Sequence, residues 1–454
     1  MARSMINNMT EGSIPRQLAA FSLPLLLANL LQALYTTVDA LVIGNFVGTN
    51  ALSAVTNCGE LINFYAMIAM GFSSAGQIII AQFVGNNDRA AIRSTIGSFL
   101  SFLTLLALGL SVACFATVKW QLSLIHLPAE AMADGEHYML ICGAGLVFVF
   151  LYNAVSGILR GMGDSKRPLV FVAVASLSNL VLDLLFVIGF GMGAAGAALA
   201  TTLGQGISVV TSLWYLYRRR ESFGFDFKPR SFIPAKKYMG MLLRLGIPMA
   251  AQFAAIMISV LFIGSRINLE GVEVSAANGI ANKLENIIRI VTNSVSTAGS
   301  AMVAQNIAAK KFDRVTKILG CVLVACLCWS VLCSLAILLF PKRIFGFFGR
   351  DDVILNYALI FAPAGVVAYL GNGCRAVCNS LINGIGFASL SLVTGLIDSV
   401  AARIGFSLLL AYTFSQGVFG FWLGSALAGW VPVIIGVTYY LSGHWKRRRL
   451  ITEQ

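Results

Sequence analysis

The ten residues SSAGQIIIAQ at positions 73–82 recur as STAGSAMVAQ at positions 296–305. The match extends along the chain at a spacing of about 224 residues, because Pro24 aligns with Pro248 and both halves end in an Arg-rich segment. Self-similarity at a fixed period is the signature of a duplicated architecture. We therefore expect an N-terminal lobe, a cytoplasmic linker and a C-terminal lobe with a basic tail, at 1–217, 218–238 and 239–454.

The composition of the repeat indicates lipid as its solvent. Of the 454 residues 58% are hydrophobic and only 11% are charged, and the mean hydropathy is +0.82. In a bilayer only helices and closed barrels satisfy every backbone polar group, and a helix needs about 20 apolar residues to cross. We predict an all-α membrane protein with twelve transmembrane helices in two homologous six-helix lobes. The expected spans are 17–44, 51–83, 94–118, 136–160, 168–190, 194–217, 239–265, 275–307, 316–340, 353–381, 388–412 and 417–441.

The basic charge of the chain is explained by membrane orientation. A formal net charge of +13 is also compatible with a nucleic-acid partner. Under the span map, however, most of the 32 Lys and Arg residues fall in loops on one side, including 218–237 and the tail at 446–449. The positive-inside rule makes that side cytoplasmic. We predict a multi-pass protein of the plasma or inner cell membrane with both termini in the cytoplasm, and no nucleic-acid partner.

Several other classes of function lack their sequence signals. There is no Gly-rich loop ending in Gly-Lys-Ser/Thr that would hold a nucleotide. His126, His137 and His444 fall in loops or the tail, and the nine cysteines lie mostly in apolar runs, which favours packed thiols over metal ligands. We therefore expect a secondary transporter that is not an enzyme and that uses neither a metal nor a cofactor, with only H⁺ or Na⁺ as coupling ion.

Acidic residues inside the spans are the main candidates for ion binding, because charge in a bilayer is expensive and persists where it has a function. Asp39 follows Pro24, which can bend the first span, by fifteen residues. Asn179 and Asp183 are four residues apart and share one face of the fifth span. We predict that Asp39, Asn179 and Asp183 form the ion-coupling or proton-coupling site, with Pro24 as a kink.

Three further acids are secondary candidates. Glu60 and Glu285 occupy equivalent repeat positions, and Arg289 stands four residues after Glu285, so we expect an ion pair there and a structural role. Asp398 precedes Arg403 by five residues, and an acid and a base in one span often neutralise each other.

Polar side chains in the first half could line a substrate cavity. The candidates are Gln32, Tyr35, Asn153 and Thr201. Each is also compatible with plain helix packing.

A set of motifs in order and spacing resembles the multidrug and toxic compound extrusion (MATE) family over essentially the whole chain. The motifs are Pro24, Asp39, Gly44 to Gly48, the ALSA at 51–54, the GMGD at 161–164 and the GAAGAALAT at 193–201. The resemblance implies two six-helix lobes in a MATE-like bundle with a V-shaped cavity, and antiport of organic cations against protons or sodium ions.

The resemblance also implies which residues act. Asp39, Asn179 and Asp183 match the ion-binding residues of the N-terminal lobe in the most similar subgroup, and Gln32 and Thr201 match polar positions that line it. The C-terminal half departs from this pattern. Its repeat equivalents of Asp39, Asn179 and Asp183 are Ile263, Arg403 and Ser407, and the tenth span carries Arg375. We therefore expect coupling to rest on the N-terminal half.

The predicted function is export of cationic or amphipathic small molecules, such as drugs or toxins, by a monomer in exchange for H⁺ or Na⁺. The alternative is a flippase or exporter of a lipid-linked or amphipathic metabolite. Relatives of that kind commonly have fourteen helices and a basic central cavity, whereas the polar cluster identified here is acidic. A carboxylate with amide and hydroxyl neighbours suits either ion.

Overall fold

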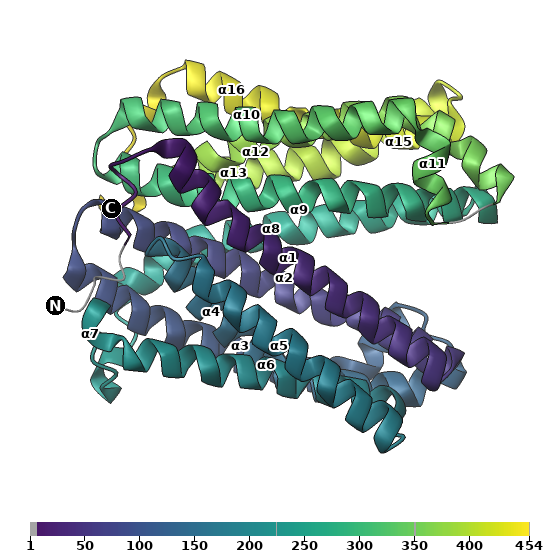
Figure 1. Ribbon diagram of the computed structural model, residues 1–454, viewed down its shortest axis with the longest axis horizontal. Helices are drawn as coiled ribbons and strands as arrows, with labels where there is room; N and C mark the ends of the chain where they lie inside the picture. The colour runs from purple at the N-terminus through teal and green to yellow at the C-terminus, as the bar shows by residue number, and fades with distance from the viewer. Residues whose placement is uncertain (1–6, 224, 349–350, 454) are drawn as a thin grey trace. The chain divides into compact units, whose positions relative to one another are not determined.

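The computed structural model describes residues 7–223, 225–348 and 351–453, and all regular elements among them are helices (Figure 1). The all-α class expected from the sequence is thus confirmed. The long helices are α1 (Ile14–Phe46), α2 (Thr49–Gly85), α3 (Arg89–Leu124), α4 (Met132–Gly161), α5 (Lys166–Asp183), α6 (Gly193–Arg218), α8 (Lys236–Asn268), α9 (Val272–Ala308), α10 (Phe312–Leu339) and α12 (Asp352–Ile385).

The remaining elements are shorter. They are η1 (Ala129–Ala131), α7 (Arg220–Phe223), η3 (Pro229–Phe232), α11 (Pro341–Gly346), α15 (Gly417–Ala428), α16 (Val431–Leu441), η6 (His444–Lys446) and η7 (Ile451–Glu453).

The fifth and eleventh expected spans are not uniform α-helices. α5 continues directly into the π-helix η2 (Leu184–Gly189). The eleventh span consists of α13 (Ala388–Leu396), the π-helix η4 (Ile397–Ile404), α14 (Gly405–Leu408) and the π-helix η5 (Leu409–Thr413). π-Helical turns are rare and occur frequently at functional sites.

Eleven helical stretches in the described part of the chain are long and apolar enough to cross a membrane. The expected span at 275–307 is the one missing from this set. It lies in α9, which has the required length of 37 residues but is less apolar, with a charged N-terminal half and amide and hydroxyl side chains in its C-terminal half. Much of α9 is buried against α10 and α12, where polar groups find partners within the protein.

The chain divides into two compact units that do not coincide with the two sequence halves. Unit 1 contains Leu27–Ala250 with the residues before Met9, and unit 2 contains Met9–Leu26 and Ala251–Gln454. The chain passes between the units inside α1 and inside α8, in each case two residues after a proline, Pro24 or Pro248. A proline removes one helical hydrogen bond, which makes these positions suited to bending.

The two ends of α1 are buried in different cores. Leu18, Phe21 and Leu25 pack in a core cluster of unit 2, whereas Val42 and Ile43 pack in a core cluster of unit 1. Burial of apolar side chains at both ends fixes the two halves of α1 separately.

The sequence repeat recurs in the hydrogen bonding within each unit. In unit 1 the Ser73 hydroxyl of α2 donates to the Asn153 carbonyl of α4 at 2.6 Å. In unit 2 the Ser296 hydroxyl of α9 donates to the Ala376 carbonyl of α12 at 2.9 Å. The tight turn before α2 and before α9 is also shared, because Gly48 and Gly271 have φ values of 111° and 125°, which side chains rarely allow.

The expected linker packs onto α3 of unit 1. The Ser101 hydroxyl donates to the Phe232 carbonyl, and the Ala235 amide donates to the Ser98 hydroxyl at 3.1 Å. Outside the spans, the pKa of Asp226 is lowered chiefly because its carboxylate accepts a hydrogen bond from the Ser231 hydroxyl. The linker is thus an ordered part of unit 1.

Candidate functional site

A half-buried and a fully buried carboxyl group meet in unit 1. Asp39 comes from α1, and Asp183 is the last residue of α5, with 1% of its surface exposed. Their side chains form a carboxyl–carboxyl hydrogen bond. In each group Oδ1 is buried and has no hydrogen-bond partner among the described residues. Because an ionised carboxylate only accepts hydrogen bonds, the contact between the two groups requires one proton.

Asn179 lies one helical turn before Asp183 and is 4% exposed. Its side-chain amide donates to the Thr201 hydroxyl of α6 at 3.3 Å. α5 and α6 approach closely here because residue 204 is a glycine: a Cβ at Gly204 would lie 3.0 Å from the Ala175 carbonyl oxygen and 3.2 Å from the Asn179 nitrogen. Close packing therefore holds the amide beside the carboxyl pair.

Two tyrosines border the carboxyl pair. Tyr35, one turn before Asp39, interacts electrostatically with both Asp39 and Asp183. Tyr138 of α4 is 6% exposed and interacts with Asp39. A phenol can donate a hydrogen bond to a carboxylate. Sequence reasoning missed Tyr138; its only signal was a polar aromatic side chain near the start of an apolar span.

The other predicted cavity residues do not join this cluster. Gln32 is exposed, and the Asn153 side chain donates to the Val149 carbonyl of its own helix at 2.9 Å. Glu60 is exposed, and among the described residues it makes no ion pair. Of the candidate cavity residues, the structure thus brings Tyr35 and Thr201 to the site, while the roles of all of them stay predictions.

Unit 2 has a different cluster at the corresponding place. The Asp398 carboxylate is fully buried and forms ion pairs with Arg375 of α12, at 2.8 Å, and with Arg403, at 3.4 Å. The expected neutralisation by Arg403 is present, and Arg375 adds a second cation. Two guanidinium groups therefore surround this acid, an arrangement quite different from the acid pair of unit 1.

The expected ion pair between Glu285 and Arg289 was wrong, because no such pair exists in the described part of the chain. The two side chains interact with different neighbours: Glu285 lies near Tyr369, and Arg289 lies near Arg375. Two residues that are four apart on one helix can form an ion pair, but here the neighbours on α12 determine where each side chain points.

The repeat equivalents of the unit 1 site show how far the units differ. Arg403 donates to the Ser425 hydroxyl at 3.2 Å, at the positions equivalent to Asn179 and Thr201. Ser407 donates to the Phe421 carbonyl at 3.2 Å, and Ile263 is buried in the apolar core of unit 2. The framework is conserved between the units, whereas the acid pair exists in unit 1 alone among the residues compared.

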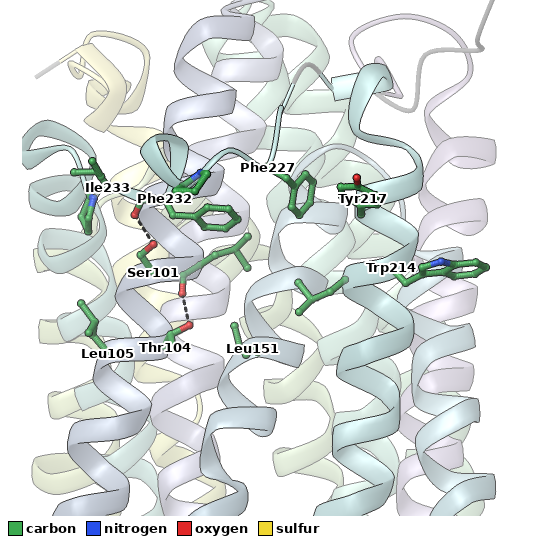
Figure 2. A pocket seen from close by; sticks show the side chains of 13 residues that line it. Ser101, Thr104, Leu105, Leu151, Trp214, Tyr217, Phe227, Phe232 and Ile233 are labelled. Carbon is green, nitrogen blue, oxygen red and sulfur yellow. Dashed lines mark hydrogen bonds between the residues drawn. The ribbon is translucent and has the colours of Figure 1, made fainter.

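A groove of about 810 Å³ lies elsewhere in unit 1, between α3, α4, α6 and the linker (Figure 2). Its wall is made almost entirely of aliphatic and aromatic side chains, and the hydroxyls of Ser101 and Thr104 donate to the carbonyls of Phe232 and Leu100. Among the described residues, no Asp, Glu, Lys or Arg lines the groove. It offers an apolar surface and no charged ligand for an ion.

Within the described residues there is also no group of three or more His, Cys, Asp or Glu that could hold a metal ion.

Comparison with known proteins gives matches over almost the full length. The family model described as MatE matches residues 24–185 and 245–409. The chain is 30% identical over 445 residues to the probable multidrug resistance protein YpnP of Bacillus subtilis, covering 98% of this chain and 99% of that protein. It is 22% identical over 451 residues to the probable multidrug resistance protein NorM of Thermotoga maritima, covering 97% and 95%.

Solved structures also match this chain over almost its full length. A MOP superfamily transporter from Pyrococcus furiosus superposes with a TM-score of 0.90 at 19% identity, covering 99% of this chain and 100% of that chain. A multidrug resistance MATE family transporter, solved in an outward-facing conformation, gives the same TM-score, identity and coverage. At this identity the likeness establishes the fold.

Proposed function

We propose, from the premise that this chain belongs to the MatE family of multidrug efflux transporters, that it is an antiporter exporting cationic or amphipathic small molecules in exchange for a proton. The family resemblance expected from the sequence motifs is thereby confirmed. We further propose that it works in the cell membrane with both termini in the cytoplasm, as the distribution of Lys and Arg predicts.

The hydrogen bond between the carboxyl groups of Asp39 and Asp183 carries the proposal. Two carboxylates cannot hydrogen-bond to each other, so this contact requires that the pair share one proton. Loss of that proton leaves two buried negative charges side by side, with no Lys or Arg bonded to them among the described residues. Such a site is stabilised either by regaining a proton or by binding a cation.

The pair is also placed to affect conformation. Asp39 belongs to α1 and Asp183 to α5, so the shared proton ties α1 to α5 within unit 1. Separation of the two carboxylates after deprotonation would shift the C-terminal part of α1. The N-terminal part of α1 is buried in unit 2, and Pro24 lies between the two parts. Proton and cargo are coupled if they favour different positions of α1.

The test is efflux of the fluorescent cation rhodamine 123 from proteoliposomes containing the full chain. A proton gradient is imposed in one set of vesicles and a sodium gradient in another. We expect efflux with the proton gradient, and we expect Asp39→Asn to reduce it to the level of empty vesicles, because a carboxamide cannot exchange a proton. Glu130→Gln, which neutralises an exposed acid of η1, is the matched control and should retain the wild-type rate.

Two outcomes would overturn the proposal. Efflux driven by sodium and not by protons would assign the site to Na⁺. Wild-type proton-driven efflux by a well-folded Asp39→Asn variant, judged by size-exclusion chromatography, would remove the acid pair from the mechanism.

A further inference from the structure

The cluster around Asp398 in unit 2 holds more positive charge than it neutralises. Asp398 is fully buried, and the side chains of Arg375 and Arg403 are 14% and 11% exposed. Arg289 of α9 lies close enough to Arg375 to act on it electrostatically. The cluster contains three guanidinium groups, those of Arg289, Arg375 and Arg403. Even with Glu285 included, it contains only two carboxylates. Arginine does not lose its proton in proteins, so the excess charge is permanent.

The π-helix η4 assembles this cluster. Residues five apart in an α-helix point about 140° away from each other, at 3.6 residues per turn. In a π-helix the repeat bond joins residues i and i+5, which brings such residues together. Asp398 and Arg403 are five apart within η4, and they form an ion pair. The equivalent stretch of unit 1 lies in the regular α-helix α5, so this device belongs to unit 2.

Hydrogen-bond donors in the cluster remain unused. Nε of Arg403 is buried and has no partner, while its Nη1 donates to Ser425 and its Nη2 to Asp398. Arg375 contacts the Asp398 carboxylate through Nη1, and no other polar partner of its guanidinium is found in the described part of the chain. An unpaired charge and unpaired donors inside a membrane protein are costly unless a ligand satisfies them.

We propose that Arg375, Arg403 and Arg289 of unit 2 form a binding site for an anionic group of the transported molecule, a carboxylate or a phosphate. The inference rests on the proposed transport function, and it extends the cargo from simple cations to zwitterionic and anionic amphiphiles. A planar guanidinium fork binds carboxylate and phosphate oxygens in pairs, and Arg375 still has free donors for this. Asp398 offsets part of the charge of the two arginines with which it pairs.

Equilibrium binding of two matched dyes tests the proposal. Rhodamine 110 carries a free carboxylate, and rhodamine 123 is its methyl ester, so the pair differs in the proposed ligand group alone. Fluorescence anisotropy with the purified full chain in neutral detergent gives both dissociation constants. We expect rhodamine 110 to bind roughly tenfold more tightly, the factor typical of one hydrogen bond to a charged group. Equal affinities in the wild-type protein would overturn the proposal.

Variants identify the residues. Arg375→Gln should bring the ratio of the two affinities close to one. Because that change breaks a buried ion pair and can disturb folding, Arg289→Gln is the second variant: it breaks no ion pair of the described residues and should lower the ratio about threefold. Asp398→Asn should raise the ratio, because it removes the competing negative charge. A ratio unchanged in all three variants, or lowered by Asp398→Asn, contradicts the site.

A lipid headgroup is the other source of such an anion. The measurement is repeated in nanodiscs of phosphatidylcholine and of phosphatidylglycerol. An undiminished preference for rhodamine 110 in phosphatidylglycerol supports a cargo site, and abolition of the preference there assigns the arginines to lipid instead. Binding at equilibrium needs no ion gradient. If Asp39→Asn keeps proton-driven efflux while the preference persists, the proposed coupling fails and the anion site stands.

Discussion

The fifth and sixth spans of unit 1 and their equivalents in unit 2 use the same framework for opposite charges. In unit 1 the Asn179 amide bonds the Thr201 hydroxyl beside two acids; in unit 2 the Arg403 guanidinium bonds the Ser425 hydroxyl beside one acid and a second arginine. The hydrogen bond occupies equivalent positions in the two units, but its donor is a neutral amide in unit 1 and a guanidinium cation in unit 2. Duplication thus supplies the geometry, and a few substitutions decide which ion or group each unit can hold.

The largest effect is expected when the arginine of unit 2 is placed at the equivalent position of unit 1. Asn179→Arg puts a guanidinium one turn from Asp183, where it would pair with the carboxylate and prevent it from taking up a proton. We expect proton-driven efflux of rhodamine 123 to fall to background. Asn179→Gln, which keeps a neutral amide, is the control and should retain measurable efflux. Full activity of a monodisperse Asn179→Arg protein would show that the charge at this position is unimportant.

A second prediction concerns how closely α14 and α15 pack in unit 2. A Cβ on Gly424 of α15 would lie 2.4 Å from the Ser407 backbone nitrogen, so Gly424→Ala forces α14 and α15 apart. Overpacking of this kind costs about 1–3 kcal/mol, and the apparent Tm in detergent should drop. Gly320→Ala is the matched control in the same unit, because its Cβ meets nothing within 4 Å. An unchanged Tm for Gly424→Ala would mean that α14 and α15 pack less tightly than described.

A smaller effect is expected from removing the hydroxyl group of Thr201. Thr201→Val keeps the shape but removes the hydroxyl that accepts from Asn179, leaving a buried donor at a cost of about 1 kcal/mol. Efflux of rhodamine 123 should slow several-fold, and Thr201→Ser should restore it because the acceptor returns. Equal rates for the Val and Ser variants would exclude a role for this hydrogen bond in positioning Asn179.

Local sequence patterns were sufficient for the architecture and for part of the site. The repeated SSAGQIIIAQ segment predicted a duplicated architecture, and equivalent hydrogen bonds occur at Ser73 and Ser296. The buried acids Asp39 and Asp183 were found as charges within apolar spans, and the structure brings them together. The length of an apolar run and a charge isolated within it are properties of a single segment, so both can be recognised from that segment alone.

Features that depend on contacts between helices could not be predicted in this way. The second partner of Asp398, Arg375, comes from another helix, and the expected pairing of Glu285 with Arg289 failed because each side chain packs against α12 separately. The π-helix η4 has no known signal in its sequence. The span at 275–307 was predicted, but the burial of its polar side chains inside unit 2 depends on helix packing and could not be read from the sequence.

We propose that the acid pair of unit 1 exchanges a proton for cargo. The direct measurement is the release of protons from the purified full chain, followed with a pH-indicator dye in weakly buffered detergent, when rhodamine 123 is added. The wild-type protein and the Glu130→Gln control should release protons in proportion to the dye bound, and Asp39→Asn and Asp183→Asn should release none. Wild-type proton release by the Asp183→Asn protein would contradict the account.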